Sequence, residues 1–266
     1  MKLIEEGQLS LDTRIGDIFD FDLKQISKDI TIRQLLNHTS GIPDYFDESV
    51  MDEYAELWTD FPNYRIRSSS DLLPLFIDKP MMYSPGAKFQ YNNTGYVVLG
   101  LIIEKIVDMS FDKYLSNVIF EPCGMKNTGY YELDRLPKNC ANAYILDEAT
   151  NEYYTNIYSV DAKGTGAGGC FTSAEDVESF WKHLLELDGG ILSKDSIQKM
   201  TSTQAAVYGY GFWLGGEEND IPYFQGSDPG VSFISSHNSD GRMVCVISNF
   251  GDDVWEIHSE LCEIYQ

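Results

Sequence analysis

Histidine is scarce and cysteine is scattered in this chain of 266 residues. The four histidines and five cysteines include no Cys-x-x-Cys pair and no spacing typical of a zinc site. We therefore expect no metal and no other cofactor. An odd number of unpaired cysteines predicts free thiols and weakly favours a reducing, cytoplasmic compartment. Localisation stays open, because a leader upstream of Met1 would leave no trace in this sequence.

Positive charge and long apolar runs are also in short supply. Nineteen Lys and Arg residues against 42 Asp and Glu give a formal net charge of −23. This balance disfavours nucleic acid and anionic membranes as partners. The longest apolar run, residues 96–103, is too short to cross a bilayer, and no signal peptide is visible. We expect no membrane segment, and the 43% of hydrophobic residues permits a sizeable core.

The order of predicted elements indicates an α+β fold. Helices are predicted at residues 31–37, 71–77, 93–107, 111–119, 172–187, 193–201 and 253–265. Strands are predicted at residues 208–214, 221–225, 231–237 and 242–249, with an irregular stretch at 134–163. Residues 96–103 are apolar on every side, so periodicity leaves a buried strand open there. We expect one domain over 1–266, with a helical region at about 20–200 and a sheet region at about 205–266.

The most informative motif is the Tyr-x-Asn formed by Tyr91, Asn92 and Asn93. A Pro85-Gly86 turn leads into it, and the predicted helix of residues 93–107 follows. This order places a phenol and a carboxamide on a tight turn at a helix mouth. The pattern recurs at residues 154–156, so it is a weak signal without its neighbours.

Five ordered segments supply that context and cover nearly all of the chain. They are residues 3–12, residues 35–43 (Leu-Leu-Asn-His-Thr-Ser-Gly-Ile-Pro), residues 85–96, residues 120–125 (Phe-Glu-Pro-Cys-Gly-Met) and residues 167–176. Together they resemble the penicillin-recognising serine hydrolases, the family of class C β-lactamases, D,D-peptidases and esterases. The resemblance implies a β-lactamase/D,D-peptidase-like fold: an antiparallel sheet with flanking helices and an inserted helical region.

The resemblance also implies a reaction that depends on three short motifs. The first, Ser-x-x-Lys, supplies a nucleophilic serine and a lysine one helical turn later. In the second, Tyr91 would relay a proton between the serine and the leaving group. Nearby cations would have to lower its pKa for that role. Asn93 would hydrogen-bond the substrate amide and the lysine.

The third motif lies on a strand that lines the site and matches residues 224–230. An ungapped match puts Phe224 at the position of a basic residue, and a shift by one puts Gln225 there. Neither residue supplies a cation. Gly226 would leave room for the substrate, and the Ser227 backbone N–H would form half of an oxyanion hole. An inner strand with a Pro-Gly turn explains the segment equally well.

The first motif is absent where the family order requires it. It should precede Gly7 by roughly fifteen to twenty residues, which is before Met1. Literal matches at residues 110–113 and 196–199 both follow Tyr91, so we expect neither to be catalytic. The chain would then lack the amino-terminal strands and the nucleophile helix. We expect an open groove, an exposed sheet edge prone to self-association, and no activity.

Two other features have simpler interpretations than the sites they suggest. Residues 164–169 match Gly-x-Gly-x-x-Gly, but no buried apolar strand precedes them. A flexible loop near the rim of the site is favoured over a nucleotide site. His38 is interpreted as a loop histidine held by backbone hydrogen bonds, because the family gives the base role to Lys and Tyr.

The sequence thus predicts a β-lactamase-related serine hydrolase that forms an acyl-enzyme. Its substrate would be a β-lactam, a D-amino-acid peptide or a small ester. In this chain the nucleophile is absent. The alternative is a catalytically dead pseudo-enzyme that binds peptidoglycan-like or peptide ligands, and the missing cation in the third motif favours it.

Overall fold

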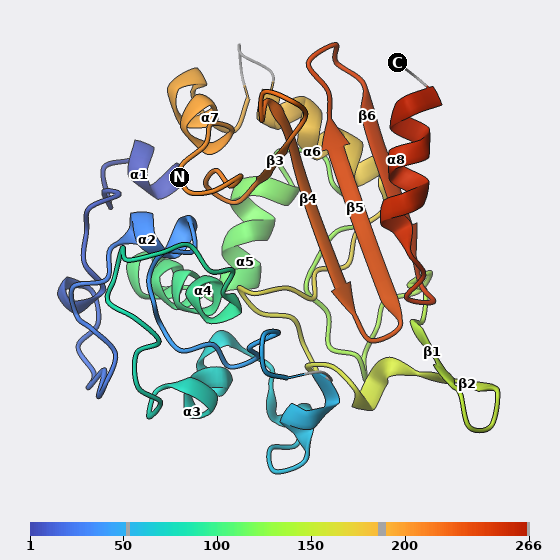
Figure 1. Cartoon of the computed structure of the whole chain (residues 1–266), viewed down its shortest axis with the longest axis horizontal. Helices are drawn as coiled ribbons and strands as arrows, with labels where there is room; N and C mark the ends of the chain where they lie inside the picture. Colours follow the sequence, from blue (N-terminus) through green and yellow to red (C-terminus); the bar gives the residue numbers. More distant parts are fainter. Residues whose placement is uncertain (52–53, 186–189, 265–266) are drawn as a thin grey trace.

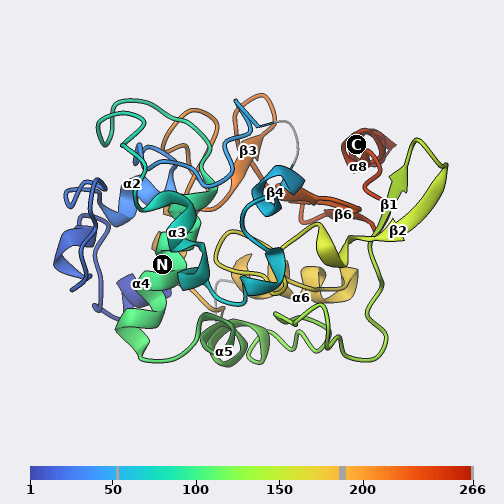
Figure 2. The same cartoon turned by 90° about the horizontal axis from the view of Figure 1, so that it is seen from below.

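A four-stranded antiparallel sheet between helices dominates one side of the computed structural model (Figure 1). The structure describes residues 1–51, 54–185 and 190–264. The strands follow chain order: β3 (Trp213–Gly215), β4 (Ile221–Asp228), β5 (Val231–His237) and β6 (Met243–Ser248). Helix α8 (Val254–Ile264) covers one face and α6 (Ala174–Leu185) the other (Figure 2). The predicted α+β fold is confirmed.

Strand alternation sends neighbouring side chains to opposite helices. Phe224 of β4 points to α6, where its ring centroid lies 5.2 Å from that of Trp181. The next residue, Gln225, points to α8 and accepts a hydrogen bond from Trp255 Nε1 (2.6 Å). Both faces of the sheet are therefore packed against helices.

The helical region is built around α4 (Asn93–Val107). Asn92 caps this helix by accepting a hydrogen bond from the Gly95 N–H (2.8 Å). The side chains of Val97 and Ile102 are buried in the core of this region. The stretch that periodicity left open is thus a helix.

The other helices that precede the sheet, apart from α6, are short. They are α1 (Lys2–Glu5), α2 (Ile32–Leu36), α3 (Leu73–Phe76), α5 (Phe111–Leu115) and α7 (Lys194–Met200). A π-helical turn, Ser116–Phe120, follows α5. The 3-10 turns are Ile15–Asp17, Tyr54–Trp58, Asn63–Arg65, Ser69–Leu72 and Asn156–Tyr158. Only part of the predicted helix at 71–77 is α-helical, and its first turn is a 3-10 helix.

The structure differs from the sequence prediction at two strands. The stretch predicted as irregular contains a hairpin of β1 (Tyr144–Asp147) and β2 (Glu152–Thr155), which projects from the molecule (Figure 2). The strand predicted at 208–214 is mostly a turn, because Gly211 has a φ of +90° and only β3 continues as a strand.

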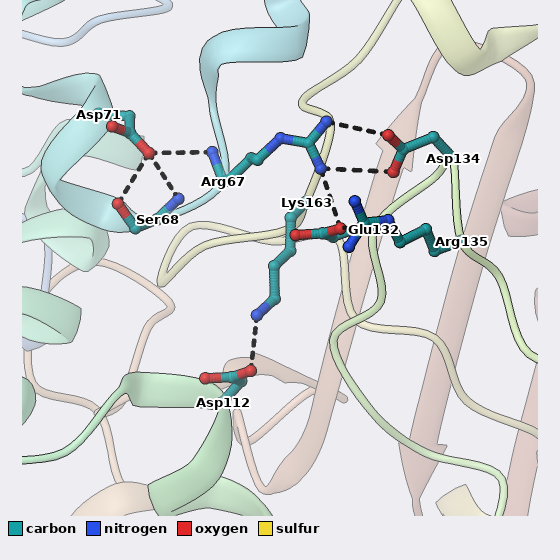
Figure 3. Close-up of polar contacts among 8 residues, drawn as sticks. All are labelled: Arg67, Ser68, Asp71, Asp112, Glu132, Asp134, Arg135 and Lys163. Carbon is teal, nitrogen blue, oxygen red and sulfur yellow. Dashed lines mark hydrogen bonds and ion pairs between the residues drawn. The ribbon is translucent and has the colours of Figure 1, made fainter.

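Ion pairs fasten the segment between α5 and α6 to the helical region (Figure 3). Arg67 pairs with Glu132 and Asp134, both at 3.1 Å. Lys163 pairs with Asp112 at 2.6 Å. Each exposed pair contributes only about 0–1 kcal/mol, so their main effect is to fix where the segment runs.

Strand β6 forms one edge of the sheet. Within the described residues it pairs only with β5, and its Ile247 is 43% exposed. This matches the predicted exposed edge, while self-association stays a prediction. None of the described helices is long and apolar enough to span a bilayer. All five cysteines are free, as predicted.

Candidate active site

The loop after α2 holds the backbone of the Tyr-x-Asn turn. The Asn92 N–H donates to Nδ1 of His38 (3.1 Å). The Asn93 and Thr94 N–H groups donate to the two carboxylate oxygens of Asp44 (2.8 and 3.0 Å). Each of three successive amides at the start of α4 thus has a fixed acceptor, so the turn has one backbone conformation.

The Tyr91 ring bridges this loop and the edge of the sheet. Its centroid lies 5.8 Å from Trp213 of β3 in a stacked arrangement and 4.4 Å from His38. The residue as a whole remains 39% exposed. Burial raises the pKa of Tyr91 well above its usual value, with smaller contributions from Tyr208 and nearby carboxylates. Tyr91 is therefore a neutral phenol at pH 7.

His38 is a loop residue held by a backbone hydrogen bond, as predicted, and it is also buried. It is 1% exposed, and its ring stacks on Tyr96 at 5.1 Å. Burial lowers the pKa of His38 to about 3, so the imidazole is neutral. Because Nδ1 accepts from the Asn92 N–H, the proton lies on Nε2. Nε2 has no hydrogen-bond partner within the described residues.

A cavity of about 290 Å³ opens beside Tyr91 and Asn93. Its lining residues are Asp44, Phe46, Asp47, Glu48, Ser49, Gln90, Tyr91 and Asn93. Asn93 Nδ2 donates a long hydrogen bond to the Phe46 carbonyl (3.4 Å). Burial raises the pKa of Asp44 to about 6, although the amide hydrogen bonds oppose this. The cavity lining thus contains the two predicted residues, Tyr91 and Asn93, together with three carboxyl groups.

Two more acidic side chains with raised pKa values, Asp161 and Asp228, lie outside the cavity lining. Asp161 accepts a hydrogen bond from the Tyr54 hydroxyl (3.2 Å), and burial together with the charge of Asp228 raises its pKa to about 7. Burial raises the pKa of Asp228 to about 6. The charge of Asp228 also raises the pKa of Tyr91, although less than burial does.

The four residues predicted from the third motif lie on β4 without contacting Tyr91. Phe224 packs into the apolar cluster under α6, and Gln225 is bonded to α8. Gly226 faces open space, and the Ser227 hydroxyl donates to the Val231 carbonyl (3.5 Å). In the described part of the chain, no hydrogen bond, ion pair or ring contact joins these four side chains to Tyr91.

Neither Ser-x-x-Lys match adjoins the cavity. Ser110 precedes α5 and lines a separate small hollow, while Lys113 is exposed. Ser196 is 5% exposed within α7, and Lys199 pairs with Asp195 at 2.6 Å. No group of three His, Cys, Asp or Glu side chains is arranged to hold a metal ion within 1–51, 54–185 and 190–264.

Sequence reasoning missed two residues that shape the site, Asp44 and Trp213, and it gave no role to Asp228 of the third motif. Asp44 directly follows the Gly-Ile-Pro turn of the second matched segment, which was the only available signal. Trp213 lies more than a hundred residues beyond Tyr91, and no spacing rule links the two residues. Asp228 belongs to the matched segment 224–230, in which only residues 224–227 were assigned roles.

Comparisons with known proteins bear on the family and the fold of this chain. The "Beta-lactamase" family profile matches residues 1–246. A penicillin-binding protein from Bacillus halodurans is 34% identical and superimposes with a TM-score of 0.93, covering 99% of this chain and 81% of that one. An octameric penicillin-binding protein homologue from Pyrococcus abyssi is 26% identical, with a TM-score of 0.80 over all of this chain and 62% of that one.

Penicillin-binding protein 4* of Bacillus subtilis (strain 168) is 27% identical over 247 residues, which are 84% of this chain and 52% of that protein. The chain spans about half the length of the curated relatives it matches. The family profile covers most of the sequence. The fold also matches that of a relative with 34% identity, over 99% of this chain. The chain therefore belongs to the β-lactamase family of penicillin-binding-protein-like serine hydrolases.

Proposed function

We propose that residues 1–266 carry the substrate-binding side of an acyl-transferring serine hydrolase site. The substrate is a β-lactam, a D-amino-acid peptide or a small ester, and this chain alone binds it without turning it over. One observation carries the proposal: Tyr91 and Asn93 line one cavity on a fixed turn, while both Ser-x-x-Lys matches lie elsewhere.

The proposed roles follow from the protonation and contacts of these side chains. Acyl transfer from a serine requires a proton for the leaving group. A neutral Tyr91 phenol can donate that proton, and its partial exposure leaves it accessible from the cavity. Asn93 Oδ1 accepts no hydrogen bond from a described residue, so it can receive one from a substrate amide.

Covalent labelling tests the proposed lack of turnover. Residues 1–266 are incubated with a fluorescent penicillin or a fluorophosphonate, and the intact mass is measured. We expect no adduct. A stoichiometric adduct on any serine of this chain would refute this part of the proposal, and Ser110→Ala and Ser196→Ala would then locate it.

A pseudo-enzyme that binds peptidoglycan-like or peptide ligands is the second candidate. The observation favouring it is the third motif, whose two candidate basic positions hold a core phenylalanine and a glutamine bonded to Trp255. The DNA upstream of Met1 separates the two functions. An in-frame Ser-x-x-Lys codon series supports the hydrolase, whereas stop codons support the pseudo-enzyme.

Self-association through the edge of β6 remains part of the proposal. The exposed edge supports it, as does the octameric state named for the Pyrococcus homologue. Sedimentation velocity over a range of protein concentrations tests it, and a monomer at every concentration would contradict it.

A further inference from the structure

The lining of the proposed substrate cavity has charge of one sign. Asp44, Asp47 and Glu48 contribute carboxyl groups, and no Lys, Arg or His belongs to the lining. Lys79 donates to the backbone carbonyl of Asp44 (3.2 Å), but it is not a lining residue. Low-dielectric walls strengthen such a field, so a bound cation is favoured and a bound anion is disfavoured.

A second observation, on the sheet side, points the same way. The Asp228 carboxyl, whose charge raises the pKa of Tyr91, has neither a hydrogen-bond donor nor a cationic partner among the described residues, and it is only partly exposed. A carboxylate in this setting is costly unless a positive group pairs with it. A ligand ammonium group beside Tyr91 would supply such a partner.

The third motif lacks the group that would bind a substrate carboxylate. Phe224 is packed under α6, and the Gln225 side chain is engaged by Trp255. A carboxylate-bearing ligand would thus meet the three acidic side chains of the lining, with Asp228 as a fourth acting on Tyr91, and no cation among the residues that line the cavity.

We infer that this site selects its substrate by positive charge, preferring acyl compounds with a free amino group, such as amino-acid amides and esters, over carboxylate-bearing compounds such as penicillins. The inference rests on the proposed function, which places the substrate beside Tyr91 and Asn93.

Three probes that share one side chain test the inference on residues 1–266. D-Phenylalanine amide carries an ammonium group at pH 6.5, N-acetyl-D-phenylalanine amide is neutral, and N-acetyl-D-phenylalanine is an anion. Dissociation constants are measured by NMR titration at low and high salt. We expect the cation to bind at least about tenfold more tightly than the anion, with the ratio shrinking in 0.5 M NaCl as the charges are screened.

Matched variants assign the effect to the cavity. Glu48→Gln removes one lining charge and should reduce the cation-to-anion ratio several-fold. Glu218→Gln removes the same charge from an exposed residue outside the lining and should leave the ratio unchanged.

The outcomes separate this inference from the proposed function. One outcome is that the three probes bind with equal affinity, or that the anion binds most tightly. If Tyr91→Phe then weakens the binding of the probes, the substrate site stands and the charge inference is wrong. If no probe binds, or Tyr91→Phe has no effect on any of them, the proposed site itself is wrong and the inference fails with it.

Discussion

The glycine-rich loop at residues 164–169 supports a prediction that separates close packing from ligand binding. Gly166 crosses α4 so closely that a Cβ added there would lie 2.3 Å from the Tyr96 carbonyl oxygen and 3.3 Å from the Gly100 Cα. Its N–H donates to the Ser69 hydroxyl (3.3 Å). These neighbours are mainly backbone atoms, which cannot rotate away. The glycine is therefore needed for helix contact, and no phosphate has to be invoked.

Gly166→Ala should consequently destabilise the fold. Overpacking a tight contact costs about 1–3 kcal/mol, and the backbone clash places this variant at the upper end. Gly168→Ala is the matched control from the same loop. A Cβ at Gly168 meets nothing within 4 Å, and its φ is not positive. It should be neutral or stabilising by about 0.4–1 kcal/mol.

Urea unfolding followed by tryptophan fluorescence measures both free energies. A shift of the Gly166→Ala midpoint to lower urea with an unchanged slope, and no such shift for Gly168→Ala, is the expected result. Equal effects of the two substitutions, or an unaltered Gly166→Ala, would refute the packing explanation for this loop.

Three further outcomes follow from the site. Asn92→Ala removes the cap of α4 and should cost about 1–2 kcal/mol in urea unfolding, whereas Asn142→Ala on the surface should change little. Burial raises the pKa of Asp161 from 3.8 to about 7, so its contribution to stability is present at low pH and is lost as pH rises through 7. Asp161→Asn should flatten this loss of stability in thermal unfolding measured between pH 5 and 8. An unchanged pH profile would contradict the burial argument. The His38 imidazole, with its pKa lowered to about 3, should show no NMR titration between pH 5 and 8.

Local patterns predicted most elements of the fold. The helix from Asn93 follows from its cap and its apolar run, and β5 begins and ends where the alternation predicts. The predicted strand at 208–214 was mostly wrong because apolar and aromatic residues there pack as a turn around glycines. Neighbouring residues set helix and strand propensity, but contacts with distant elements decide whether a short apolar segment pairs with another strand.

The sequence by itself determined the family, the Tyr91–Asn93 turn and the negative net charge, because these reside in residues close together in the chain. Only the tertiary structure decided what surrounds Tyr91. It places Asp44 and Trp213 near one ring, and it directs Phe224 and Gln225 away from that ring to opposite faces of the sheet. Side-chain direction on β4 depends on strand register and on the helices packed against each face, and neither can be read from local spacing.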